Sequence, residues 1–281
     1  MSRNPVEKLA VAARGPSTSL GMTETDLASS SSAALNIRLA MNYTAAISDF
    51  FKSPKWTMNA LLGGVCALIP FVGQIVVLGW TITGFWGRDE ENCETFPDFD
   101  FSHFGKYLER GLWPFLVTFV TSLVMIPLVW VVTIPTMLIG TLAAGSNEKA
   151  GGCFAGIMWV VMMFLIMLLV LALMLLLTPL KIRASITQDF AKSFNFAWIK
   201  RFVSLMWKEI FLASLFLLVA GMALSLAGMV LFCVGVYAAT VVTYFAWTHL
   251  HKQLYRLYLS RGGEPVPFSP KLRDTPPPMP A

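Results

Sequence analysis

Four long stretches of the chain contain no Asp, Glu, Lys or Arg, and they constrain the fold more than any other feature. They cover residues 56–87, 111–140, 150–180 and 210–248. A helix that crosses a bilayer needs about 20 apolar residues, because the hydrocarbon core is about 30 Å thick and each residue rises about 1.5 Å. Every stretch exceeds that length. The sequence therefore predicts an all-α, polytopic transmembrane helix bundle.

The composition supports this class of protein. Only 13% of the residues are charged, whereas a soluble domain carries about a quarter. All 21 basic and 16 acidic residues lie between or outside the four stretches. Buried helices of a soluble protein would leave too much apolar surface uncovered, so we expect the bilayer to cover it.

The lengths of the stretches favour six helices over four. As one helix, the 39 residues of 210–248 would run about 58 Å, so we expect two helices with a turn near Gly228. The stretch 56–87 is interrupted by Pro70 and Gly73, which break a helix and permit a reversal. A hairpin is expected there, and the alternative is one kinked helix. The predicted order is hairpin, two single spans, hairpin.

The distribution of basic residues predicts the orientation. Six Lys or Arg precede the first stretch, three follow it, then one, then six, and five follow the last stretch. Basic residues concentrate in cytoplasmic segments. Six helices place every segment rich in basic residues on one side, so both termini are expected in the cytoplasm. We expect a multi-pass protein of the bacterial inner membrane.

The segments around the spans divide the chain into three parts. Residues 1–40 are rich in Ser, Thr and Ala and are expected to be disordered, as is the Pro-rich tail 261–281. Met22 is a second candidate start. Residues 41–260 form the predicted helical domain. Apolar residues recur at helical spacing before the spans, which predicts amphipathic helices that lie in the cytoplasmic interface or extend the spans. These residues are Tyr43, Ile47, Phe50 and Phe51, then Phe101, Phe104 and Leu108, then Phe190, Phe194, Ala197 and Trp198.

The candidate functional residues are few. No Asp, Glu, His, Lys or Arg lies in the four stretches, so proton relays and intramembrane carboxylate sites lack their usual residues. The weak candidate is a helix-break site at Pro70, Gly73 and Gln74, because transporters use broken helices to bind substrate. Catalytic residues, cofactors and a metal site are not expected. The acidic connection 89–100 lacks the spacing of a calcium loop, and His249 and His251 face different sides of a helix.

Three motifs occur in a recognisable order. They are "IPFVGQIVVLGW", "FPDFDFSHFGKYLERGLWPFLV" and "CVGVYAATVVTYFAWTHLHKQLYRLYLSRGGEP". Together, over residues 42–264, the chain resembles the bacterial membrane family called domain of unknown function 4013. In that family an Ile-Pro with a later Gly follows the first helix, as at Ile69-Pro70 and Gly73 here. The resemblance implies a helical membrane protein and supplies neither an activity nor site residues.

The function expected from these features is that of a non-enzymatic membrane component or accessory subunit. The alternative is a small transporter or channel for a neutral or lipid-like molecule. The expected partners are the lipid bilayer and either another membrane protein or a second copy of the chain. Nucleic acid is not an expected partner, because the basic residues flank the spans, where they meet lipid head groups.

Overall fold

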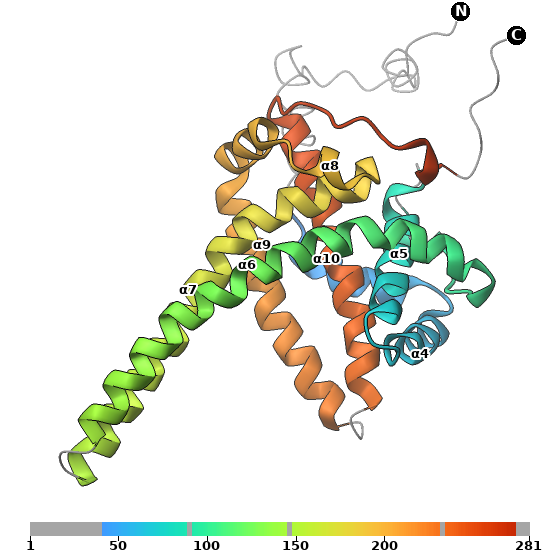
Figure 1. The fold of residues 1–281 in the computed structure, drawn as a ribbon. Coiled ribbons are helices and arrows are strands. Elements are labelled where there is room, and N and C mark those ends of the chain that lie inside the picture. The colour runs from blue at the N-terminus through green and yellow to red at the C-terminus, as the bar shows by residue number, and fades with distance from the viewer. Residues whose placement is uncertain (1–40, 89–91, 145–147, 231–233, 274–281) are drawn as a thin grey trace, which may run out of the picture. The chain divides into compact units, whose positions relative to one another are not determined.

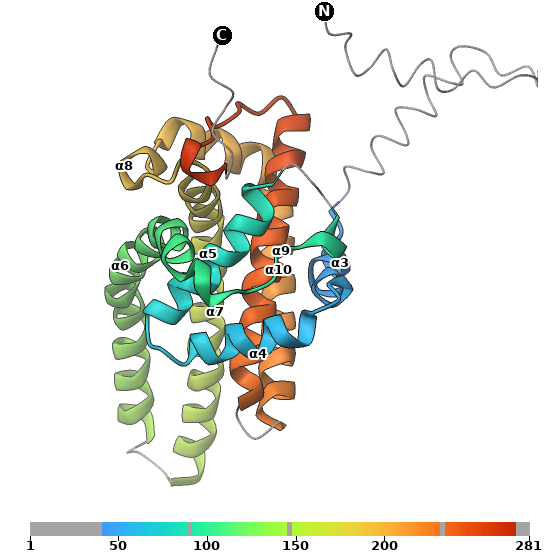
Figure 2. The ribbon, with the colours of Figure 1, turned by 90° about the vertical axis from the view of Figure 1, so that its right-hand side faces the viewer.

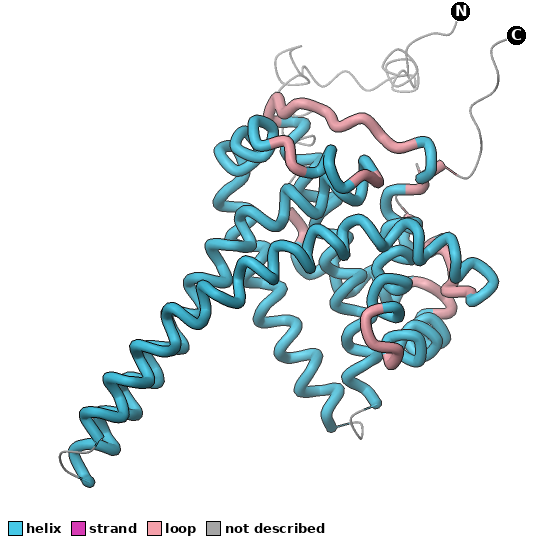
Figure 3. Tube along the Cα trace, viewed as in Figure 1, coloured by secondary structure: helices cyan, strands magenta, loops and turns pink. Residues whose placement is uncertain are grey.

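Helices alone build the described part of the chain. The computed structural model describes residues 41–88, 92–144, 148–230 and 234–273, and no strand occurs among them (Figure 3). This confirms the all-α class. Residues Met1–Ala40 form a separate unit from Met41–Ala281. The predicted disorder of residues 1–40 and of 274–281 concerns positions outside the described ranges.

The helices follow one another with short connections (Figure 1). In chain order they are α3 (Tyr43–Ser48), η1 (Asp49–Lys52), α4 (Trp56–Ala67), α5 (Val72–Trp86), η2 (Cys93–Thr95), η3 (Phe101–His103), α6 (Phe104–Ala144), α7 (Glu148–Thr187), α8 (Phe190–Ser193), α9 (Phe196–Val230), α10 (Val234–Ser260) and η4 (Pro270–Leu272).

The first apolar stretch forms two helices, as the hairpin prediction required. Pro70 lies in the short connection between α4 and α5, which pack against each other. Phe71 adopts the left-handed region with φ 61° at this corner. A Cβ at Gly73 would lie 2.7 Å from the carbonyl carbon of Cys66, so only glycine allows this close approach. The kinked-helix alternative therefore does not apply.

Helices α6 and α7 run side by side (Figure 1). They contain the second and third apolar stretches, predicted as single spans. Their most apolar windows are only 6% and 11% buried within the described structure. Pro114, Pro127 and Pro135 lie inside α6, and Pro179 lies inside α7. The helices therefore continue through these prolines instead of ending at them.

The fourth stretch is divided between α9 and α10, as predicted. Helix α9 continues to Val230, slightly beyond the expected turn near Gly228, and α10 begins at Val234. A Cβ at Gly228 would lie 2.7 Å from the backbone of Gly235. The two glycines therefore allow the paired helices to approach closely. Figure 2 shows α4 crossing this pair, and Gly63 of α4 faces Val241 of α10.

The prediction of six membrane helices is confirmed only in part. The six helical segments are present, but among the described residues three helices are long and apolar enough to cross a membrane: Phe101–Leu142, Gly156–Thr187 and Phe196–Val230. Helices α4 and α5 have 12 and 15 residues, which gives lengths of about 18 and 22 Å. Both are shorter than the hydrocarbon core, because the corner at Pro70 divides a stretch that is too short for two spans.

Some of the predicted amphipathic residues lie in short elements that pack onto the bundle, whereas Phe104 and Leu108 belong to α6 and Trp198 belongs to α9. Residues 43–52 form α3 and η1, in which Phe50 is buried against Phe245 of α10 with ring centroids 5.3 Å apart. Its neighbour Phe51 is exposed. Helix α8 has only four residues. The apolar spacing therefore correctly identified helical turns that contact the core. They form short elements or extend the long helices α6 and α9, instead of forming independent interfacial helices.

Residues 261–273 correct the prediction that the tail is disordered from residue 261. The amide of Val266 donates to the Tyr255 hydroxyl at 2.8 Å, and the amide of Ser269 donates to the carbonyl of Ile186 at 3.0 Å. Val266 and Leu272 are buried. These two apolar side chains and the hydrogen bonds hold the segment against α7 and α10. The proline-rich composition of the tail gave no indication of this packing.

Candidate functional site

The predicted helix-break site has a defined backbone but an outward-facing polar residue. Gly73 is buried in the corner between α4 and α5, where its amide donates to the carbonyl of Ile69 at 3.0 Å. Pro70 and Gln74 are exposed. The structure thus brings the three predicted residues together around one corner. The role of this corner in binding a substrate stays a prediction.

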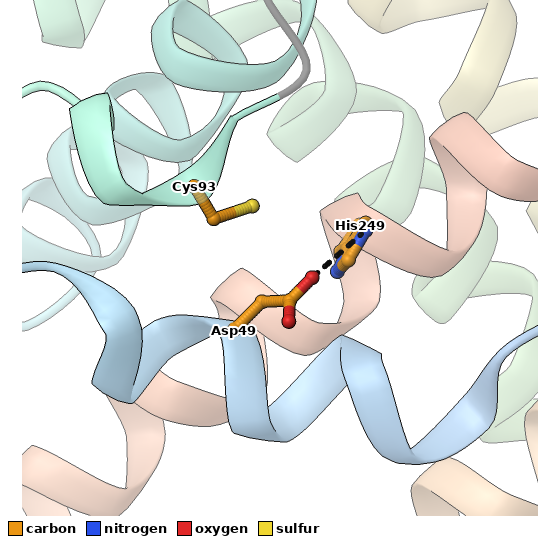
Figure 4. Close-up of side chains that lie close together, drawn as sticks. All are labelled: Asp49, Cys93 and His249. Atoms are coloured by element: carbon orange, nitrogen blue, oxygen red, sulfur yellow. Dashed lines mark ion pairs between the residues drawn. The ribbon is translucent and has the colours of Figure 1, made fainter.

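A second group of side chains combines three residue types that ligate metals. Asp49 comes from η1, Cys93 from η2 and His249 from α10 (Figure 4). One ligating atom from each lies within 4.8 Å of the other two. The Oδ2 atom of Asp49 is 3.9 Å from Nε2 of His249. Carboxylate, thiol and imidazole groups in this proximity can hold a transition-metal ion.

Local interactions position each member of this cluster. Nζ of Lys52, one turn later in the chain, lies 2.7 Å from Oδ1 of Asp49, which leaves Oδ2 toward His249. The His249 ring stacks on Phe85 of α5 with centroids 5.0 Å apart and an interplanar angle of 15°. The guanidinium of Arg88 donates to the carbonyls of Asn92 and Thr95, which flank the turn that carries Cys93.

Burial controls the protonation of the cluster. Burial, with a smaller contribution from the neighbouring Asp49 carboxylate, raises the pKa of the Cys93 thiol to about 11. Burial is also the main cause that lowers the pKa of His249 to about 4; Asp49 opposes this shift, and Lys252 and Arg256 contribute to it. At neutral pH the imidazole is therefore neutral and the thiol is protonated when no metal is bound.

A cavity of about 220 Å³ adjoins the cluster. Its lining includes all three members of the cluster together with Arg88, Asn92, Phe96, Lys252, Gln253 and Arg256. The space exceeds that of a single water molecule. A small polar ligand can therefore reach the carboxylate and imidazole from this side.

Comparison with known proteins places the chain in a family. The model for a family described as protein of unknown function, DUF4013, matches residues 62–233. The chain belongs to the DUF4013 family. Neither the curated proteins nor the solved structures contain a match. The family match confirms the resemblance over residues 62–233, which include the first two of the three sequence motifs.

The DUF4013 match includes only part of the cluster. It covers Cys93 and the helix-break residues, begins after Asp49 and ends before His249. It contains half of α4 and all of α5, α6 and α7, together with α9. The family match therefore describes the apolar helices and does not assign the three-residue cluster.

Two buried cations of this DUF4013 chain lie just beyond the charge-free stretches. Arg110 donates from Nη1 to the Thr83 hydroxyl at 3.1 Å and from Nη2 to the carbonyl of Lys271 at 2.8 Å. Nζ of Lys181 lies 3.6 Å from the ring centroid of Trp247. The apolar helices thus extend past their charge-free portions. Arg110 joins α5, α6 and the packed tail, which is a structural role.

Sequence analysis did not identify the three-residue cluster. Its members are separated by 44 and 156 positions in the chain, so no local spacing joins them. The histidines were considered together, but His249 meets Asp49 instead of His251. No sequence signal joins the three residues, because Asp49 and Cys93 begin short 3-10 turns whereas His249 lies in the middle of α10.

Proposed function

We propose that this DUF4013 protein is an integral protein of the bacterial inner membrane that acts as a non-enzymatic accessory subunit. In this proposal both termini are cytoplasmic, and α6 and α7 form the surface that contacts another membrane protein or a second copy. The surrounding lipid covers the remaining apolar surface. The proposal rests on the exposed apolar faces of α6 and α7.

Both helices expose apolar side chains, as does the distal part of α9. Val131 on α6 and Val160 on α7 are 68% and 64% exposed, whereas α5 and the first part of α9 are largely buried. In a membrane, helices associate mainly through close packing and interhelical hydrogen bonds. The distal parts of α6 and α7 contact each other, and their remaining apolar faces are available for packing against another membrane helix.

An open glycine on α7 supports protein contact as well as lipid contact. Gly156 is exposed, and a Cβ built there would meet no atom within 4 Å. Glycines at membrane helix surfaces allow another helix to approach closely. Gly156 also completes the Gly-x-x-x-Gly pattern that begins at Gly152.

Site-specific photo-cross-linking in native membranes tests the proposal. A photoreactive phenylalanine derivative is introduced at position 131 or 160, and at Val219 of α9 as an exposed control, which is 59% exposed. We expect positions 131 and 160 to give a discrete protein adduct at a yield at least ten times that of position 219. Adducts with lipid alone at both test positions would refute the proposed contact surface.

A second candidate function is transport of a neutral or lipid-like molecule. The observation that favours it is the corner at Phe71, whose left-handed backbone is costly for a bulky residue. Such conformations concentrate at functional sites. If this function is correct, Gln74→Ala lowers flux in liposomes, whereas an exposed control substitution such as Val219→Ala does not. Equal flux in both variants would contradict the candidate site.

A further inference from the structure

We propose that Asp49, Cys93 and His249 form a binding site for a divalent transition-metal ion, with zinc the best match. The site lies on η1, η2 and α10 and is independent of the proposed accessory role of α6 and α7. Figure 4 shows the three side chains directed toward a common point. The proposal assigns a ligand to a cluster that the family match leaves without a role.

The geometry is close to that of an occupied site. In tetrahedral zinc sites, bonds of about 2.0 Å to nitrogen or oxygen and about 2.3 Å to sulphur place the ligand atoms roughly 3.3–3.6 Å apart. The Asp49 Oδ2 and His249 Nε2 atoms are 3.9 Å apart, and all three ligating atoms lie within 4.8 Å of one another. Closure by about 1 Å therefore completes the arrangement, and side-chain rotation can supply this shift.

The donor set selects among metal ions. Calcium and magnesium prefer oxygen ligands, whereas a thiolate and an imidazole suit zinc and its neighbours. Binding replaces the proton on the Cys93 sulphur with a bond to the metal, and the proton leaves to water. The thiolate and the Asp49 carboxylate then neutralise the two charges of the ion, which offsets the cost of burying it.

The surroundings provide the features that a metal site needs beyond its ligands. Lys52 holds Oδ1 of Asp49 at 2.7 Å, as an outer-shell partner orients a ligating carboxylate. Phe85 fixes the plane of the His249 ring. Asp49 and His249 retain side-chain exposures of 13% and 14%, and the adjoining cavity of about 220 Å³ offers an entry path and space for a fourth ligand. Three protein ligands with an open position resemble the arrangement of catalytic zinc sites.

Titration with Co²⁺ tests the site directly, because cobalt replaces zinc and its bond to a thiolate gives a charge-transfer absorption in the near ultraviolet. The full chain is purified in detergent, freed of metal with a chelator and titrated with Co²⁺ alone. We expect one equivalent to bind with the thiolate absorption, and one equivalent of Zn²⁺ to displace it. Failure of the wild-type protein to show the absorption at saturating Co²⁺ would overturn the proposal, whatever the variants do.

Matched variants assign the ligands. Cys93→Ser is expected to abolish the thiolate absorption, and Asp49→Asn and His249→Gln to weaken Co²⁺ binding at least tenfold. Cys66→Ser provides the control, because Cys66 is also buried but belongs to α4 outside the cluster. Circular dichroism verifies that each variant is folded. Persistence of the absorption in folded Cys93→Ser, or its loss in Cys66→Ser, would refute the assignment.

Discussion

The contact between α5 and α6 depends on two glycines that face each other, and replacing one of them tests the packing directly. A Cβ at Gly79 would lie 2.6 Å from the carbonyl carbon of Tyr107 and 2.9 Å from the amide nitrogen of Gly111. A Cβ at Gly111 would lie 2.8 Å from the amide nitrogen of Gly79. Ordinary contact begins near 3.4 Å. Gly79→Ala therefore forces the two backbones apart by about 1 Å.

The expected cost follows from this overlap. Overpacking a well-packed core destabilises by about 1–3 kcal/mol, and we expect a value near the upper end because a backbone cannot rotate away as a side chain can. For a domain of this size, about 3 kcal/mol corresponds to a fall in Tm of roughly 6–12 °C. Thermal unfolding of the purified protein in detergent, followed by circular dichroism, measures this shift.

Gly105→Ala is the matched control for Gly79→Ala. Gly105 lies in α6, and a Cβ there would meet nothing within 4 Å. Alanine favours a helix interior over glycine by about 1 kcal/mol, so the Tm of this variant should stay equal or rise by a few degrees. If Gly79→Ala melts within about 2 °C of both the wild type and Gly105→Ala, the close approach of α5 and α6 is wrong.

Three further predictions concern the packed tail, the loop before α6 and the orientation. Leu272→Ala should destabilise the protein by about 2–5 kcal/mol, because Leu272 is fully buried. The control Lys271→Ala removes only an exposed ion pair and should change Tm little. Equal Tm values of the two variants would contradict the packing of the tail. Asn59→Ala should cost about 1–3 kcal/mol, measured by denaturation, because the buried Asn59 Oδ1 accepts from the amide of Phe99 at 2.9 Å. Unchanged stability of Asn59→Ala would contradict this contact. In a variant whose other cysteines are Ser, the exposed Cys153 should react with a membrane-impermeant maleimide in intact cells. Reaction only after lysis would show the opposite orientation.

The apolar stretches predicted most of the helical architecture because their length and lack of charge are local properties. The reversal at Pro70 and Gly73 was also recognisable, since both residues act through their own backbone. The number of helices that cross the membrane was harder to predict from the sequence. Residues 56–87 were predicted to form two spans. The turn at Pro70 divides them into α4 and α5 with 12 and 15 residues, which is too few for either helix to cross the hydrocarbon core.

Tertiary contacts determined what the sequence could not predict. The tail at 261–273 has the composition of an extended segment, yet Val266 and Leu272 enter a surface formed by distant helices. Asp49, Cys93 and His249 likewise come together only when η1 and η2 pack against α10. Composition and periodicity describe single elements, and these features depend on how several elements meet.

The central claim is that α6 and α7 form a contact surface for another membrane protein or a second copy. Native mass spectrometry of the protein released from nanodiscs prepared directly from its own membrane tests this claim. We predict a stoichiometric complex heavier than the 31.0 kDa chain by a whole second chain. Gly156→Leu, at an exposed position on α7 where a Cβ would meet no atom within 4 Å, should dissociate this complex. A particle containing a single 31.0 kDa chain with lipid alone would contradict the account.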